Sequence, residues 1–194
     1  MTIRQVRDTA FDLWHIMHPA KDTIAIPVEE RWRPPLLGWV KCNTDAAYYA
    51  EDSHGASACV LRDHNGRFMA GQAKWYERCL DACAMEAMAC RDALGLAQQC
   101  GVQKLHLETD CLELVQLWER REEQRSAIYP VLMEIKDLSL VFFDFLFTFA
   151  SRNCNKVAHV LTRQVTSIET SGVWHETPDC VRVLLESECN PGHI

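Results

Sequence analysis

The chain has 194 residues, of which 48% are hydrophobic and 24% charged, and its formal net charge is −7. This balance is typical of one globular domain with extensions. The acidic charge argues against a protein that coats nucleic acid non-specifically, because such affinity comes mainly from Lys and Arg on phosphates. No apolar run is long enough for a membrane span, and the N-terminus lacks the apolar core of a signal peptide. We therefore expect an intracellular protein, cytoplasmic or nuclear, that is not secreted and does not contact membranes.

Ten cysteines are scattered along the chain, and Cys42, Cys59 and Cys90 lie within apolar patterns. Reduced thiols in the core of an intracellular protein explain this distribution best. The alternative is a zinc site. No Cys-x-x-Cys pair occurs, and Cys79 and Cys83 lack a matching second pair, so the spacing does not favour zinc.

A short amphipathic helix is predicted at residues 6–17, followed by a linker up to residue 35. Pro27, Pro34 and Pro35 interrupt regular structure in this linker. Residues 1–35 are therefore expected to be a helix and a linker or extended arm that precede the main domain. The apolar positions of the helix are Val6, Ala10, Leu13, Trp14 and Met17.

Three antiparallel strands are expected at the start of the main domain, over residues 39–49, 55–62 and 67–75. The second and third strands are joined by Asp63-His64-Asn65-Gly66. An Asn-Gly pair between two strand-like runs is a strong hairpin signal, because both residues tolerate positive φ. The sequence therefore predicts a hairpin between the second and third strands.

A long helix is predicted next, from its N-cap Asp81 to about Gln99. Gly101 lies just after its expected end. Small residues share one side of this helix with Glu86, and small side chains let a helix lie close to a sheet. We therefore expect the helix to carry Glu86 toward the strand ends. The small residues are Ala89, Cys90, Ala93 and Ala97.

The rest of the main domain alternates strands with helices. The order β-β-β-α-β-α-α-β-α predicts an α/β fold with a mixed five-stranded sheet and helices on both faces. The main domain is expected to span residues 36–166. Residues 167–194 are expected to form a tail that packs on the core, with a helix near residues 180–186. The remaining strands are predicted at residues 104–109 and 144–151, and the helices at residues 111–123, 129–141 and 155–164.

Three carboxylates give the clearest indication of the chemistry of this protein. Two strand-like segments deliver Asp45 and Asp110 at their carboxyl ends, and Glu86 lies early in the long helix. In such sheets the reactive site lies beyond the carboxyl ends of the parallel strands. Taken singly, Asp45 also fits an exposed strand end, and Asp110 also fits a helix N-cap. If they converge, these hard oxygen ligands would hold the Mg²⁺ that phosphoryl-transfer chemistry requires.

A series of short motifs runs in order through residues 31–165. They are Trp32-x-Pro34-Pro35, Val40-Lys41-x-Asn43-x-Asp45-x-Ala47, Val60-Leu61-Arg62-Asp63-His64-Asn65-Gly66, Glu86-Ala87, Glu108-Thr109-Asp110 and Arg152-x-x-Asn155-x-Val157-Ala158-His159-x-Leu161. The ordered series, more than any one motif, resembles the ribonuclease H-like domains of plant non-LTR retroelement reverse transcriptases.

The resemblance implies a ribonuclease H-like fold and cleavage of the RNA strand of RNA–DNA hybrids by a two-metal mechanism. It places the metal ligands at Asp45, Glu86 and Asp110, with two Mg²⁺ ions as cofactors and Mn²⁺ as a substitute. Asp45 would bridge both ions, Glu86 would serve one ion beside a ribose 2′-OH, and Asp110 would hold the other. His159 takes the position of a fourth catalytic carboxylate, and the alternative for it is a structural side chain.

The resemblance also implies an RNA–DNA hybrid as the partner, while protein partners stay open. Arg152, Asn155 and Lys156 are the expected phosphate contacts, although they also fit a solvated helix start. Asn43 and Ala46, which flank the first carboxylate, are further expected nucleic-acid contacts. The family usually has Gly where this chain has Ala46. Because Gly lets the protein backbone lie close to the substrate, Ala46 is expected to leave less space there.

Other features favour a different class of function. Residues 119–125 mix both charge signs, where bacterial enzymes of this type have a basic helical handle, and the whole chain is acidic. These features, with His159, fit a domesticated module that keeps the fold but only binds nucleic acid or protein. A third alternative is a fragment of a retroelement polyprotein, with residues 2–35 as its connection. Glu108, which alternates with Asp110, is expected to be a supporting or solvent-facing residue.

Overall fold

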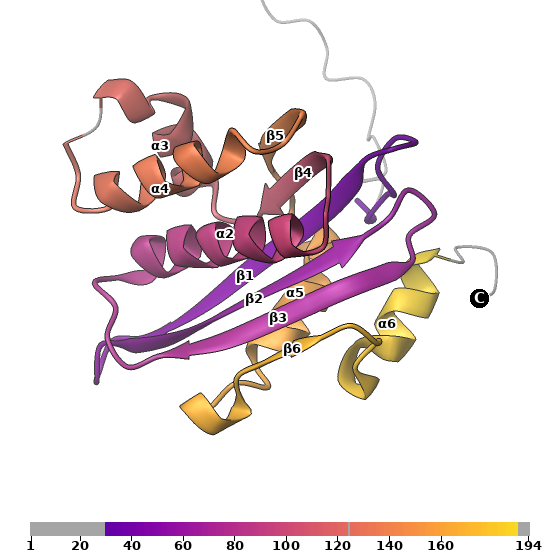
Figure 1. The fold of residues 1–194 in the computed structure, drawn as a ribbon. Helices are drawn as coiled ribbons and strands as arrows, with labels where there is room; N and C mark the ends of the chain where they lie inside the picture. Colours follow the sequence, from indigo (N-terminus) through magenta and orange to yellow (C-terminus); the bar gives the residue numbers. More distant parts are fainter. Residues whose placement is uncertain (1–29, 124, 190–194) are drawn as a thin grey trace, which may run out of the picture.

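The architecture is one six-stranded mixed sheet with helices on both faces (Figure 1). A computed structural model describes residues 30–123 and 125–189, so the helix predicted at residues 6–17 lies outside the described residues. The strands are ordered β5-β4-β1-β2-β3-β6 across the sheet. They are β1 (Val40–Tyr49), β2 (His54–Arg62), β3 (Phe68–Tyr76), β4 (Lys104–Thr109), β5 (Asp144–Phe149) and β6 (Gly172–Trp174).

The predicted hairpin between β2 and β3 is present. Gly66 has a φ of 79°, whereas Asn65 does not take positive φ. The carboxylate of Asp63 stabilises the turn, because its Oδ1 accepts 2.8 Å hydrogen bonds from the backbone N–H groups of Asn65 and Arg67. The turn is therefore held by a side chain, and only its glycine needs the left-handed region.

The sheet has one strand more than the sequence predicted. β6 pairs antiparallel with β3, from Gly71 opposite Trp174 to Ala73 opposite Gly172. Three residues are too few to show the alternation that reveals a strand in a sequence. The prediction of five strands is therefore corrected to six. The mixed character is confirmed, because β1, β2 and β3 are antiparallel while β4 runs parallel to both β1 and β5.

Helices cover both faces of the sheet, as predicted (Figure 1). One face carries α2 (Ala82–Gln99), α3 (Leu112–Glu119) and α4 (Tyr129–Ser139), and the other carries α5 (Lys156–Thr162) and α6 (Asp179–Cys189). The α3 helix is shorter than predicted, because Arg120 leaves the helical conformation and a 3₁₀ turn follows at Arg121–Glu123. Within the described residues, no helix combines the length and the apolar character that a bilayer crossing needs.

The long helix α2 lies close to the sheet because its buried side is built from small residues. It begins at the predicted N-cap, where Asp81 Oδ1 accepts a 2.7 Å hydrogen bond from the backbone N–H of Ala84. The small residues of this side are at most 1% exposed, and they are Ala89, Cys90, Ala93 and Ala97. The predicted core thiols Cys42 and Cys59 are buried and free.

Segments before and after the main domain also pack on the sheet. Trp32 lies on the linker side of the boundary predicted at residue 36, and it is only 4% exposed. From the other end of the chain, Glu188 of α6 forms an ion pair with Arg62 of β2. Both segments therefore contact the face of the sheet that carries α5.

Candidate metal centre

Asp45 and Asp110 are neighbours because the pairing of two parallel strands ends just before them. The last registered pair of β1 and β4 is Thr44 opposite Thr109. The next residue on each strand is a carboxylate. Since side chains alternate along a strand, Asp45 and Asp110 share the face of the sheet that carries α5.

Glu86 reaches the same place from α2, on the opposite face of the sheet. A residue with a Cβ at position 55 would hold α2 away, because this atom would lie 2.6 Å from the sulfur of Met85 and 2.6 Å from the carbonyl oxygen of Ala47. Gly55 thus permits the close approach of the first turn of α2. Thr109 at the end of β4 then donates a 3.3 Å hydrogen bond to Glu86 Oε2.

The three carboxylates meet in one cluster. Asp45, Glu86 and Asp110 each offer an oxygen, and these ligand atoms all lie within 4.8 Å of one another. They come from β1, from α2 and from the end of β4, three elements that are distant in the sequence. The structure therefore brings together the residues that the sequence analysis selected as metal ligands.

Burial and mutual repulsion raise the pKa of two of these carboxyl groups. For Asp45, burial is the main cause, and the charge of Asp110 adds to it while contacts with Thr162 and His159 oppose it. The pKa of Glu86 is raised well above its ordinary value, first by burial and then by the charges of Asp45 and Asp110. A divalent cation would remove this repulsion, and an all-oxygen donor set fits Mg²⁺ or Mn²⁺.

His159 lies beside the cluster on α5. Its Nδ1 is 3.3 Å from Asp45 Oδ2, and its side chain is 28% exposed. One turn later, Thr162 donates a 3.3 Å hydrogen bond to the backbone oxygen of Asp45. The α5 helix therefore holds Asp45 through both its backbone and its carboxylate, and leaves an edge of the imidazole open to solvent.

Asn155 supports the cluster from within the protein, which corrects one expectation. Its side chain is fully buried, and its Nδ2 donates to the backbone oxygen of Thr44 at 2.8 Å and to Asp110 Oδ1 at 3.2 Å. A buried amide with these partners orients Asp110 and cannot reach a phosphate. Arg152 and Lys156, on either side of it, are exposed and stay the predicted phosphate contacts.

The expected nucleic-acid contact of Asn43 is corrected in the same way. Asn43 is fully buried, and its amide group contacts Trp32, Arg62 and Glu108. It is thus not available to a nucleic acid. Ala46 is half-buried on β1, and its contact with substrate stays a prediction.

A thiol pair borders the cluster. Cys83 lies in the first turn of α2, and Cys111 directly follows Asp110. A hydrogen bond from Cys83 stabilises the thiolate of Cys111 and lowers its pKa to about 7. The same hydrogen bond, and then burial, raise the pKa of Cys83.

Sequence reasoning missed several supporting side chains. Thr162 belongs to no motif, and only its position one turn after His159 could have indicated a role. Thr109, Trp32 and Arg62 did carry a signal, since all three belong to the ordered motifs. The motifs did not show, however, that Trp32 and Arg62 both bond to Asn43. Glu108, expected to be supporting or solvent-facing, is a buried supporting residue.

A known family accounts for this combination of fold and cluster. A family model described as reverse transcriptase-like matches residues 43–165. The chain belongs to this family of ribonuclease H-like domains. No curated protein matches the sequence.

Solved structures with the same fold are ribonucleases H. The N-terminal RNase H domain of a Mycobacterium tuberculosis protein is 14% identical with a TM-score of 0.59, over 64% of this chain and 91% of that one. RNase H1 of Halobacterium salinarum is 19% identical with a TM-score of 0.56, over 61% and 89%. LC11-RNase H1, solved in complex with an RNA/DNA hybrid, is 14% identical with a TM-score of 0.59, over 67% and 96%. At these identities the likeness shows the ribonuclease H fold alone, and it confirms the predicted fold.

Proposed function

We propose that this protein is a metal-dependent endonuclease that cleaves the RNA strand of RNA–DNA hybrids. The observation that carries the proposal is the cluster of Asp45, Glu86 and Asp110 on a ribonuclease H fold, with all ligand oxygens within 4.8 Å. The raised pKa values of Asp45 and Glu86 support it, because they mark a site that needs positive charge. The hybrid substrate is supported by the family and by a structural neighbour that was solved with an RNA/DNA hybrid.

Each carboxylate has a distinct role in the proposed mechanism. Two divalent ions, when bound, would activate a water molecule and stabilise the leaving 3′ oxygen of the scissile phosphate. Asp45, which is buried, would contact both ions. Asp110, oriented by Asn155, would hold one ion, and Glu86 would hold the other while accepting a hydrogen bond from a ribose 2′-OH. That last contact would distinguish RNA from DNA.

The exposed basic residues next to the cluster would position the strand. Arg152 and Lys156 begin the segment that carries His159 toward Asp45. Phosphate contacts of this kind fix the register of a nucleic acid without reading its sequence. His159 would then assist at the metal or at the departing phosphate group.

A second candidate function is that of a binding module with little or no catalysis. The mixed charges at residues 119–125 and the net charge of −7 favour it, because both weaken the electrostatic attraction to the phosphates of a hybrid. Such a module would bind nucleic acid or a protein partner and would leave the hybrid intact. The two candidates therefore differ in whether the phosphodiester bond is broken.

A gel assay with labelled substrates separates the two functions. The full chain would be incubated with an RNA–DNA hybrid, single-stranded RNA or duplex DNA, in Mg²⁺ or Mn²⁺. The proposed enzyme cuts the hybrid alone, and Asp45→Asn abolishes the cut. Asp137→Asn is the matched control, because Asp137 is an exposed acid on α4 outside the cluster. An intact hybrid under all conditions would leave the binding module as the function.

A further inference from the structure

A buried polar network lies directly behind the metal centre. Asn43 and Glu108 are opposite each other on β1 and β4, one same-face position before Asp45 and Asp110. Asn43 Nδ2 donates a 2.9 Å hydrogen bond to Glu108 Oε2. This bond joins the two strands by side chains just before their backbone pairing ends at Thr44 and Thr109, which is where the metal ligands begin.

Two donors fix the direction of the Asn43 amide. Trp32 Nε1 donates to Asn43 Oδ1 at 2.9 Å, and Arg62 Nη2 donates to the same oxygen at 2.7 Å. Because both neighbours can only donate, the amide oxygen must face them and the NH₂ group must face Glu108. The guanidinium of Arg62 also stacks on Trp32, with its central carbon 3.5 Å from the ring centroid. Trp32, which lies in the segment before β1, therefore fixes the orientation of the Asn43 amide and of the Arg62 guanidinium.

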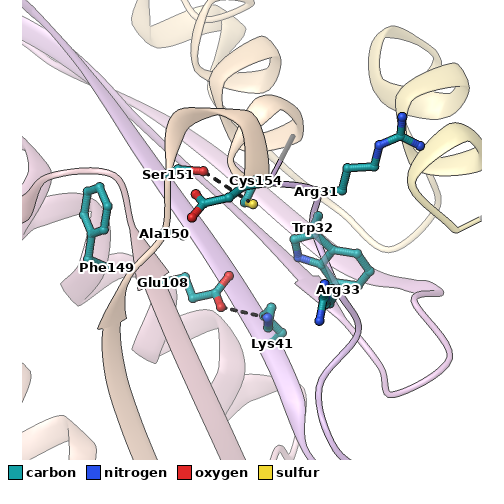
Figure 2. Close-up of a pocket in the computed structure, with 10 residues that line it drawn as sticks. Arg31, Trp32, Arg33, Lys41, Glu108, Phe149, Ala150, Ser151 and Cys154 are labelled. Atoms are coloured by element: carbon teal, nitrogen blue, oxygen red, sulfur yellow. Dashed lines mark hydrogen bonds and ion pairs between the residues drawn. The ribbon is translucent and has the colours of Figure 1, made fainter. Parts of the chain in front are cut away.

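Both carboxylate oxygens of Glu108 have partners in the same network. Lys41 Nζ lies 2.7 Å from Glu108 Oε1, so one carboxylate oxygen faces Lys41 and the other faces Asn43. Figure 2 shows Lys41 and Glu108 joined in this way on the wall of a pocket of about 290 Å³ that Trp32 also lines. A fourth carboxylate, two residues before Asp110, is thus neutralised and held away from the metal ligands.

We propose that Asn43 and Trp32 are positioning residues of the metal centre, which set the separation of Asp45 and Asp110 and thereby the affinity for the divalent ion. The inference rests on the proposed function only in assuming that this ion is the one that the nuclease uses. The pairing of β1 with β4 ends before the two carboxylates, although β1 stays paired with β2 as far as Tyr49 opposite His54. Between Asp45 and Asp110 the two strands are therefore linked by side-chain bonds, from Asn43 to Glu108 behind them and from Asn155 beside them. The segment around Trp32 therefore belongs to the catalytic unit, although it precedes the first strand.

Direct binding of Mn²⁺ to the full chain tests this proposal. Free Mn²⁺ would be followed by electron paramagnetic resonance, with each variant in the absence of nucleic acid. Asn43→Ala should raise the Kd for Mn²⁺ by about tenfold or more, the usual effect of losing a group that orients a metal ligand. Trp32→Phe keeps a ring on Arg62 and loses only the N–H donor, so its Kd should rise by a smaller factor. This milder variant keeps the test valid if Asn43→Ala fails to fold.

Tyr76→Phe is the matched control for lost stability. It removes a hydrogen bond to the half-buried Asp92, and neither residue belongs to the metal cluster or to the Asn43 network, so it should lower Tm and leave the Kd unchanged. If Asn43→Ala and Trp32→Phe also lower Tm with an unchanged Kd, the network is structural and the proposal is overturned. A parent protein that binds no Mn²⁺ would overturn both the metal centre and this inference. A parent that binds Mn²⁺ but cuts no hybrid would overturn the nuclease alone, and the Kd values would still decide the inference.

Discussion

The side chain of Asp45, on the α5 face of the sheet, and Glu86, from α2 on the opposite face, meet with ligand oxygens within 4.8 Å of each other. Burial and this proximity raise the pKa of both groups. Without a cation, ionisation of the second carboxylate is opposed by the charge of the first. The metal-free centre is therefore destabilised at neutral pH, and this property can be measured without any substrate.

Asp45→Asn tests the central ligand. The substitution removes the charge shared by the proposed ions and leaves no cavity, so the fold should persist. Metal stabilisation of a transition state is worth several kcal/mol, which corresponds to about a thousandfold in rate, and hybrid cleavage should fall by at least this factor. In EDTA the variant should melt a few degrees higher than the parent, because repulsion is relieved. Cleavage at the parent rate would exclude Asp45 as the ligand of an active centre.

The pH dependence of stability tests the raised pKa of Glu86. In EDTA the folded protein keeps a proton on Glu86 at pH values where the unfolded chain, with a pKa of about 4.3, has lost it. Stability should therefore fall as pH rises from that ordinary value through the raised one. Glu86→Gln cannot titrate, so its Tm advantage over the parent should grow between about pH 4.5 and pH 8. Saturating Mg²⁺ should remove most of the advantage, and thermal melts at several pH values measure it. An advantage that stays constant with pH would show that Glu86 ionises normally.

The sequence was most informative where a local pattern determines a position. Asp110 directly follows β4, whereas Asp45 lies inside β1 and not at its carboxyl end as predicted. Asp45 still meets Asp110, because the pairing of β1 with β4 ends at Thr44. With the small residues of α2 placing Glu86 close to the sheet, the convergence of these carboxylates could be anticipated. The hairpin at Gly66 and the N-cap at Asp81 have local causes, because their decisive contacts lie within a few residues along the chain.

The roles of Asn43 and Asn155 could not be read in the same way. Asn155 bonds to a residue 111 positions away in the sequence, and Asn43 is buried because Trp32 and Arg62 cover it. An amide at the end of a strand or at the start of a helix fits a phosphate contact equally well until those partners are known. β6 was not predicted for a different reason, because its three residues are too few to show the side-chain alternation of a strand.

Salt dependence tests the exposed basic residues at the start of α5. Each phosphate contact contributes about 0.9 to the slope of log K against log salt on B-DNA. Replacing both Arg152 and Lys156 by Ala should therefore flatten the slope by up to about 1.8 and weaken hybrid binding. Arg182→Ala on α6 is the control, because Arg182 is exposed and pairs with Asp179. Binding by fluorescence anisotropy over a range of salt concentrations gives the slopes. A double variant with the parent slope would place the nucleic-acid path elsewhere.

His159 offers the sharpest test of how this centre differs from a four-carboxylate one. Its Nδ1 lies 3.3 Å from Asp45 Oδ2, so an imidazole, which carries no negative charge, lies where a fourth carboxylate would help to hold a second ion. Mn²⁺ accepts nitrogen ligands more readily than Mg²⁺ does, and we expect it to support faster cleavage. His159→Asp should shift the preference toward Mg²⁺ and raise the rate at low metal concentration. Rates measured against metal concentration for both ions decide the question.

The same substitution has a second readout that needs no activity. A new carboxylate beside Asp45 adds repulsion, so His159→Asp should lower the metal-free Tm and increase the rise in Tm on adding Mg²⁺. His159→Ala should leave the metal-free Tm close to the parent value and reduce cleavage by about tenfold, as for a group that supports a metal ligand. This loss is much smaller than that expected for Asp45→Asn, because a neighbour of the proposed bridging carboxylate is removed and the carboxylate itself remains. Unchanged rates and metal preference in both variants would make His159 a structural side chain and leave a centre of three carboxylates.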